Sequence, residues 1–428
     1  MERLRKKLNS GGFDALFAEM YGARSAAQRQ RYAALLENFE ARFGARENAA
    51  FFSAPGRTEI CGNHTDHNHG LALAAAVDLD IIAVAAPWDE SFVCLKSEGH
   101  DENRVSLEEL MPRALQEENP HSNALIRGIL ARFRQLGRPV GGFCACTTAD
   151  VRSGSGLSSS AAFEILLCTI LHQLYGNGDM DPVLQAQIAQ YAENEYYHKP
   201  SGMMDQTAAA VGHMLLVDFA SPDRPAVTRL PVDPGGQGAF ARLHLCVTAP
   251  GGTHARLTDA YASITREMRA VARALGVEFL RDARREALLA QLPELRVRCG
   301  DRAVLRALHF FDENERVERM AEALRHGRQT EFLRLVRESG QSSFMYLQNV
   351  TTPDDPACQE LALALCLSQR ILGENGAYRV HGGGFAGTIQ AFVPDDLLAP
   401  YCREMDAAFG DGACCTLSIR SCGGIKLA

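Results

Sequence analysis

The sequence predicts an α+β protein built from two domains. Strand-like and helix-like patterns alternate from about residue 51 to residue 234. The segment Asp218–Gly238, rich in proline and glycine, reads as a linker. A second half then begins with the strand-like Leu243–Thr248, continues through several helices and closes with further strands. We therefore expect a helical extension (1–50), a first domain (51–234) and a second domain (235–428).

The remaining elements follow from apolar spacing. The first 50 residues are polar and rich in alanine, and the sequence assigns them no role. Leu71–Pro87 is a long apolar run interrupted by Asp78 and Asp80; carboxylates are costly inside a membrane, so we expect a pair of buried strands. The pattern also predicts helices over 1–48, Ser159–Tyr175 and Gln185–Tyr197, and strands at Phe51–Pro55, Phe143–Thr148, Tyr378–His381 and Thr388–Val393.

Composition excludes several classes of protein. The chain has 428 residues, 46% of them hydrophobic and 22% charged, which is typical of a folded globular protein. Its net charge of -8 argues against nucleic-acid binding, and acids are interleaved with the arginines of Arg256–Arg337. The basic Met1–Asn9 lacks the apolar core of a secretory signal. The 13 cysteines are scattered without a Cys-x-x-Cys pair, so we expect reduced, mostly buried thiols in a cytoplasmic protein.

A glycine- and serine-rich loop precedes the predicted helix Ser159–Tyr175. Its glycines let backbone N–H groups turn toward an anion, and the start of a helix favours phosphate. No lysine follows the glycines, so the loop is not a Walker A motif, and an ordinary serine-capped turn is the plain alternative. The candidate phosphate-binding residues are Gly154, Ser155, Gly156, Leu157, Ser158, Ser159 and Ser160.

Another glycine-rich stretch, Gly382–Gly387, satisfies the spacing G-x-G-x-x-G. A dinucleotide-binding loop requires a helix next, whereas Thr388–Val393 has a strand pattern. A hairpin that lines a site is the better interpretation.

The segment Arg57–Gly70 is unusually dense in hydrogen-bonding groups and lies between two apolar stretches. Such density suits a polyol, because each hydroxyl needs a donor or an acceptor. A surface loop is one alternative. A metal site is another, since four side chains of this segment are possible ligands: His64, Asp66, His67 and His69.

A third group of polar residues surrounds a break between two predicted helices. Glu193 lies near the end of the first helix, and Asp205 opens the next helical run after Gly202. Taken alone, Asp205 would be read as a helix cap.

Four of these segments, in this order, resemble the motifs of galactokinases, members of the GHMP kinase superfamily, from about Phe51 to the C-terminus. The resemblance implies a two-domain GHMP kinase fold that holds a nucleotide and a sugar between the domains. The matching segments are Arg57 with Gly62–Asp66, the loop Gly154–Ala162, Gly202–Gln206 and His381–Gly387.

The resemblance also implies roles for individual residues. Asp205 matches the aspartate that faces the anomeric hydroxyl, and Arg57 matches the arginine beside it. Ser160 and Glu193 match ligands of Mg²⁺. The matching sugar-binding positions are Asn63, His64, Asp66, Gly202 and, less closely, Tyr261.

Three positions depart from the family pattern. Asn63 stands where the family has Glu, His67 where it has Tyr, and Arg152 where it has Pro. Asn carries no charge, so we expect galactose to remain the preferred sugar, with more tolerance for altered C6 groups.

The expected activity is ATP-dependent phosphorylation of the C1 hydroxyl of D-galactose, giving galactose 1-phosphate for galactose catabolism. A kinase acting on N-acetylgalactosamine, galacturonate or arabinose is the alternative, as is a non-catalytic sensor of sugar and ATP. The expected cofactors are ATP and Mg²⁺. We expect a cytoplasmic monomer whose partners are small molecules, without nucleic acid or a membrane.

Overall fold

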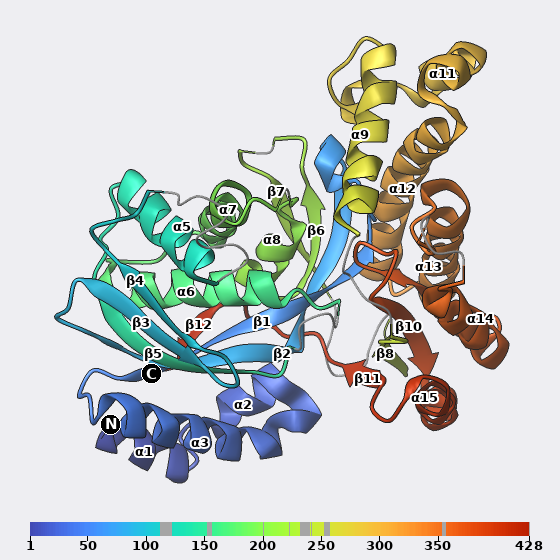
Figure 1. Cartoon of the computed structure of the whole chain (residues 1–428). Coiled ribbons are helices and arrows are strands. Elements are labelled where there is room, and N and C mark those ends of the chain that lie inside the picture. Colours follow the sequence, from blue (N-terminus) through green and yellow to red (C-terminus); the bar gives the residue numbers. More distant parts are fainter. Residues whose placement is uncertain are drawn as a thin grey trace.

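The computed structural model describes residues 1–111, 122–151, 156–199, 201–221, 223–231, 240, 242–251, 257–352 and 357–427. Within these residues the chain forms two β-sheets with helices packed around them (Figure 1). The helices of the first half are α1 (Glu2–Asn9), α2 (Asp14–Tyr21), α3 (Ser25–Phe43), α5 (Ser122–Gln135), α6 (Ser159–Tyr175), α7 (Pro182–Tyr191) and α8 (Met204–Val211). Those of the second half are α9 (Thr258–Ala274), α10 (Arg285–Ala290), α11 (Leu292–Cys299), α12 (Asp301–Arg325), α13 (Gln329–Ser342), α14 (Glu360–Leu372) and α15 (Asp395–Phe409).

The first sheet has eight strands. Their order is β12-β1-β2-β5-β3-β4, and β6 joins β2 to β7 at a branch. The pairs are antiparallel except β3 with β5, which is parallel. The strands are β1 (Ala50–Cys61), β2 (Leu71–Pro87), β3 (Phe92–Ser97), β4 (Glu102–Ser106), β5 (Phe143–Ala149), β6 (Met214–Asp218), β7 (Ala226–Leu230) and β12 (Ile425–Leu427).

The predicted pair of strands over Leu71–Pro87 is wrong, because this run is the single 17-residue strand β2. Its two carboxylates do not interrupt the strand, since arginines distant in sequence neutralise them. Asp78 pairs with Arg24, and Asp80 pairs with Arg31 and Arg420. A buried carboxylate is tolerated when it is paired and hydrogen-bonded, so β2 remains continuous.

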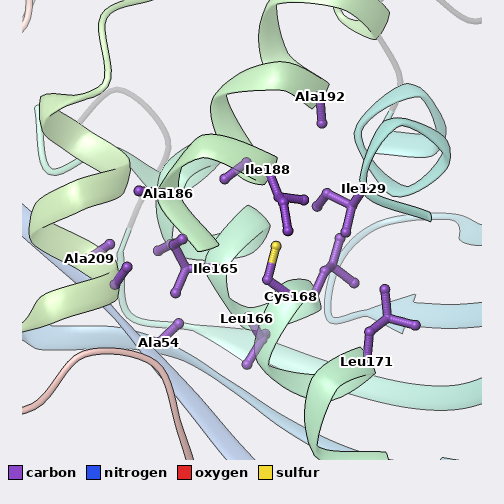
Figure 2. Close-up of a cluster of buried hydrophobic side chains, with 14 of the residues drawn as sticks. Ala54, Ile129, Ile165, Leu166, Cys168, Leu171, Ala186, Ile188, Ala192 and Ala209 are labelled. Atoms are coloured by element: carbon purple, nitrogen blue, oxygen red, sulfur yellow. The ribbon is translucent and has the colours of Figure 1, made fainter. Parts of the chain in front are cut away.

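One face of the first sheet is covered by α5, α6, α7 and α8, and a large apolar core fills the space between (Figure 2). The helical spacing in Ser159–Tyr175 predicted α6 with its observed bounds. α6 contributes Ile165, Leu166 and Leu171 to this core, and α7 contributes Ile188. The core fixes the N-terminal end of α6 in place, and the glycine- and serine-rich loop precedes that end.

The first 50 residues cover the opposite face of the same sheet. Their helices α1, α2 and α3 place Phe17, Tyr32 and Phe39 against side chains of β1, β2 and β5. The predicted helical character of this extension is confirmed. Without these helices, the buried face of Phe51, Ile82 and Val84 would be exposed to water.

The second sheet has four strands in the order β11-β8-β10-β9, all antiparallel. They are β8 (Leu243–Thr248), β9 (Ala377–His381), β10 (Thr388–Pro394) and β11 (Cys414–Leu417). β9 and β10 form the predicted glycine-rich hairpin. The C-terminal β12 pairs with β1, so the end of the predicted second domain returns to the first sheet.

Two further expectations are corrected in part. The predicted linker Asp218–Gly238 contains the strand β7, which pairs with β6. All 13 cysteines are free, but only six are buried, so the expectation of mostly buried thiols fails. Within the described ranges, no helix combines the length and apolar character needed to cross a membrane.

Candidate functional site

The site is built around an ion pair between β1 and the first turn of α8. Arg57 binds both carboxylate oxygens of Asp205, with Nε–Oδ1 and Nη2–Oδ2 distances of 2.5 Å. Arg57 also donates to the carbonyl of Gly156, and its own N–H donates to the carbonyl of Leu157 at 3.0 Å. The pair therefore joins three segments that lie far apart in the sequence, and it confirms that Arg57 and Asp205 are neighbours.

The surroundings keep Asp205 ionised. Burial alone would raise the pKa of the Asp205 carboxyl, but the charge of Arg57 and hydrogen bonds from Arg57 and Ser158 outweigh it, so the pKa lies below its ordinary value. The side chain of Asp205 is 27% exposed, whereas that of Arg57 is 8% exposed. The carboxylate is thus accessible to an incoming hydroxyl, while the guanidinium is held inside the protein.

The start of α6 lies against this pair. Ser158, at the N-cap, has a left-handed backbone with φ 55°, and its side chain makes no capping hydrogen bond. The N–H groups of the first turn therefore have no side-chain cap, which suits a bound phosphate. Ser159 and Ser160 open the helix, while Gly154 and Ser155 of the predicted loop lie outside the described residues.

Ser160 meets the predicted metal ligand Glu193. The Ser160 hydroxyl donates to Oε1 of Glu193 at 3.1 Å. Glu193 lies in η3 (Ala192–Tyr196), a π-helical turn that continues α7. Such turns inside helices are rare and often mark functional sites. Two oxygens at this separation suit neighbouring positions around Mg²⁺, whose ligands lie about 2.1 Å away and so roughly 3 Å from one another.

Three residues to which the sequence analysis gave no role surround Glu193. Lys199 contacts Oε1 at 2.6 Å, and Ser201 and Gln206 donate to Oε2 at 2.6 and 2.8 Å. Gln206 also donates to Glu164 at 3.2 Å. Burial, and then the charge of Glu193, raise the pKa of Glu164 well above its ordinary value, so Glu164 is a neutral acid behind Glu193. In the sequence, Ser201 and Gln206 belong to the same polar group as Glu193 and Asp205, and Lys199 lies six positions after Glu193.

The hairpin between β9 and β10 closes against the start of the phosphate loop. A Cβ at Gly156 would lie 2.0 Å from Oγ1 of Thr388 and 2.9 Å from Nδ1 of His381, so only glycine fits there. His381 Nε2 accepts from the N–H of Glu59 at 3.3 Å, and Nδ1 therefore donates to Thr388 at 2.9 Å. Burial lowers the pKa of His381 well below its ordinary value, so the ring is neutral.

The predicted sugar-binding residues come together in two pairs. A Cβ at Gly202 would lie 1.7 Å from Oδ2 of Asp66, so the missing side chain allows the carboxylate to approach. His64 donates to the carbonyl of Gly383 at 3.0 Å, and Tyr261 donates to that of Gly384 at 2.9 Å. Burial, followed by the charge of His67, lowers the pKa of His64 to about 3.

Asn63 occupies a different position from the one its motif implies. Its side-chain amide donates to Glu59 at 2.9 Å and to the carbonyl of Gly382 at 2.7 Å, and it accepts from Asn349 at 2.7 Å. The residue is 1% exposed. Both hydrogens and the oxygen of the amide are therefore used inside the protein. This placement argues against the predicted direct contact of Asn63 with a sugar.

The alternative metal site at His64, Asp66, His67 and His69 is not supported. Across the described part of the chain, one group of three or more His, Cys, Asp or Glu side chains brings its ligand atoms close enough to share an ion. That group lies in the second half of the chain and contains none of these four residues.

Two family models match the chain. The galactokinase galactose-binding signature matches residues 37–87, which include Arg57 and the loop after β1. The model of the GHMP kinase N-terminal domain matches residues 124–213, which include α6, Glu193 and Asp205.

Curated relatives cover most of the chain. Human galactokinase is 31% identical over 388 residues, which are 89% of this chain and 92% of the human protein. Bovine galactokinase is 34% identical over 81% of this chain and 83% of its own length, and Streptomyces coelicolor galactokinase is 31% identical over 87% and 92%.

Solved structures share the fold. Lactococcus lactis galactokinase complexed with galactose superposes with a TM-score of 0.80 at 22% identity, covering 93% of this chain and all of that one. Mevalonate kinase from Methanococcus jannaschii superposes with a TM-score of 0.61 at 14% identity, covering 88% and 99%. Together with the identity to curated relatives and the matched signature, this similarity shows that the chain belongs to the galactokinase family of the GHMP kinases.

Proposed function

We propose that the protein transfers the γ-phosphoryl group of ATP to the C1 hydroxyl of D-galactose, and so supplies galactose 1-phosphate for galactose catabolism. One observation carries the proposal. An ionised, partly exposed carboxylate at Asp205 lies between the start of α6, which suits phosphate, and the loop that carries His64 and Asp66. A base between a phosphate site and a polyol site is the arrangement that phosphoryl transfer to a sugar requires.

Asp205 accepts the proton of the C1 hydroxyl in this mechanism. Arg57 holds the carboxylate in one orientation through two hydrogen bonds and keeps it ionised at neutral pH. The same pairing makes Asp205 a weak base, so its proton transfer accompanies late formation of the bond to phosphorus. Holding the hydroxyl in line with the phosphoryl group is then the larger contribution of Asp205.

The first turn of α6 would bind phosphate oxygens through its N–H groups, with Gly154, Ser155, Gly156, Leu157, Ser158, Ser159 and Ser160 forming the loop. Ser160 and Glu193 would hold Mg²⁺, which neutralises charge on the phosphates. Lys199 contacts the same oxygen of Glu193 and would add positive charge beside the metal ligands.

His64, Asp66, Gly202 and Tyr261 remain proposed sugar-binding residues. Their support is that Asp66 lies against Gly202, three residues before Asp205, and that His64 and Tyr261 both bond to the 383–384 backbone. The three-part division 1–50, 51–234 and 235–428 and a monomeric state also remain proposals. Thirteen free thiols support a reducing, cytoplasmic location.

The test is a panel of free sugars with ATP, read by ADP release and by ³¹P NMR of the product. We expect the highest kcat/KM with galactose and a phosphate on the anomeric carbon. Higher kcat/KM with N-acetylgalactosamine, galacturonate or arabinose would overturn the choice of sugar but keep the kinase. ATP binding without ADP release for any sugar would favour the sensor.

A further inference from the structure

Three cysteine thiols converge on the outer face of the second sheet. Cys246 comes from β8, Cys402 from α15 and Cys414 from β11. Their three sulfur atoms all lie within 4.8 Å of one another, and the Sγ atoms of Cys402 and Cys414 are 3.8 Å apart. Cys402 follows Cys246 by more than 150 positions, and Cys414 follows Cys402 by 12. No spacing motif therefore revealed the cluster.

The cluster is independent of the kinase site. Side chains alternate between the two faces of a strand. Leu245 and Val247 of β8 face the core shared with the first sheet, whereas Cys246 faces the separate core under α14 and α15. Cys415 likewise packs toward the first core, so only its neighbour Cys414 joins the cluster.

The spacing of the sulfur atoms matches a tetrahedral thiolate site. Zinc–sulfur bonds are about 2.3 Å long, which places two sulfurs of a tetrahedron about 3.8 Å apart. That is the distance between Cys402 and Cys414. A disulfide would require the same atoms to approach to about 2.05 Å.

The electrostatic surroundings also suit a cation. Asp406 lies one helical turn after Cys402, and its Oδ1 accepts from the N–H of Cys414 at 2.9 Å. Cys246 is fully buried, while Cys402 and Cys414 are partly exposed, which leaves a route for an ion.

We propose that Cys246, Cys402 and Cys414 form a binding site for a soft divalent cation such as Zn²⁺, with water as the fourth ligand. Each thiol that ligates the ion gives up its proton to solvent, and no redox step is involved. The ion would tie α15 to the edge of the second sheet.

The test uses Co²⁺ as a spectroscopic probe on the full-length protein. One equivalent of Co²⁺ should produce sulfur-to-cobalt charge-transfer absorption and the visible bands of a tetrahedral site, and Zn²⁺ should abolish them. Cys402→Ser and Cys414→Ser should lose the signal, and the matched control Cys415→Ser should keep it. Zn²⁺ should raise the Tm of wild type and Cys415→Ser but not of the two cluster variants.

Basal galactokinase turnover should be the same in all three variants, so failure of the metal site does not bear on the kinase. The proposal is overturned if wild type gives no thiolate absorption, or if the Cys402→Ser and Cys414→Ser spectra equal that of wild type. Recovery of Cys402 and Cys414 as a disulfide from protein that binds no Co²⁺ would also overturn it.

Discussion

Two buried arginine–aspartate clusters in this molecule differ mainly in access. Asp80 is 0% exposed and is held by Arg31, Arg420 and the hydroxyl of Tyr21. Asp205 is 27% exposed and has Arg57 as its charged partner within salt-bridge distance. Charge neighbours lower the pKa of both carboxyls against the opposing effect of burial, so both are ionised. Ionisation therefore does not distinguish the two carboxylates, whereas the exposed fraction of the side chain does.

The closed cluster around Asp80 should govern stability and leave turnover unchanged. Asp80→Asn removes the charge that Arg31 and Arg420 share, so we expect a loss of about 3–5 kcal/mol in the free energy of unfolding. As a control, Asp14→Asn breaks an exposed pair with Arg29 within the N-terminal extension, and it should change the free energy of unfolding little. Urea unfolding measures the stability of each variant, and the turnover of its folded fraction measures activity. Equal stability of the two variants would contradict the structural role of Asp80.

Asn63 is buried like Asp80, so Asn63→Glu should lower the free energy of unfolding and leave the sugar preference unchanged. The new carboxylate would lie beside Glu59, whose pKa burial already raises despite Arg379. We expect a loss of roughly 1–3 kcal/mol, typical of a buried polar group left without a partner.

The exchange variant Glu59→Gln with Asn63→Glu keeps one carboxylate and one amide in the pair, and it should recover part of that loss. Rates with galactose, 6-deoxygalactose and galacturonate should keep their order in both variants. A reordered preference in Asn63→Glu with unchanged stability would restore Asn63 as a direct sugar contact.

Glu193 and Glu164 offer a finer comparison, because both are buried and share Gln206. Glu193→Gln removes a charge, so the Mg²⁺ concentration for half-maximal activity should rise roughly 10- to 100-fold. Glu164→Gln replaces a neutral acid with a neutral amide and should shift that concentration little. Mn²⁺ binding followed by EPR gives a readout that does not depend on turnover. If both variants respond alike, the assignment of charge to Glu193 alone is wrong.

The smallest effect per residue concerns three neutral, buried histidines near the candidate site. Burial lowers the pKa of His64, His309 and His381. Their unfolded pKa is about 6.5, so the stability they carry is complete above that pH and is lost as the pH falls toward their folded values. Each should contribute a slope of up to about 1.4 kcal/mol per pH unit.

Urea unfolding between about pH 7 and pH 5 measures this slope. His309→Gln should reduce it, whereas His244→Gln, at an exposed position beside Asp395, should not. An unchanged slope in His309→Gln would show that His309 takes up its proton in the folded protein.

Sequence patterns within short segments correctly predicted the helices and strands whose formation depends on neighbouring residues. The apolar spacing of α6 and the strand pattern after Gly387 both gave the observed structure. The run Leu71–Pro87 was divided wrongly, because the charges that neutralise Asp78 and Asp80 come from Arg24, Arg31 and Arg420. No local pattern records partners so distant in sequence.

The candidate site shows the same limit. Motifs identified Arg57 and Asp205 as neighbours, and Ser160 and Glu193 as another pair. They did not reveal that the Asn63 amide is fully used by Glu59, Gly382 and Asn349, because that depends on how the second sheet meets the first. The three-cysteine cluster was missed because only the folding of α15 against the second sheet brings its members together. Lys199 was missed although it lies only six positions after Glu193.

The most direct test of the distinction between the partly exposed Asp205 and the buried Asp80 is the substitution Asp205→Asn. We expect turnover with galactose to fall by about 10²–10⁴, the usual contribution of a positioned base, while ATP binding by calorimetry stays close to wild type. The urea midpoint should fall less than in Asp80→Asn, because the amide oxygen that the substitution introduces can still accept from Arg57. Near-normal turnover would remove Asp205 from the chemistry. A loss of stability as large as that of Asp80→Asn would show that the Arg57–Asp205 pair is a structural cluster like the one around Asp80.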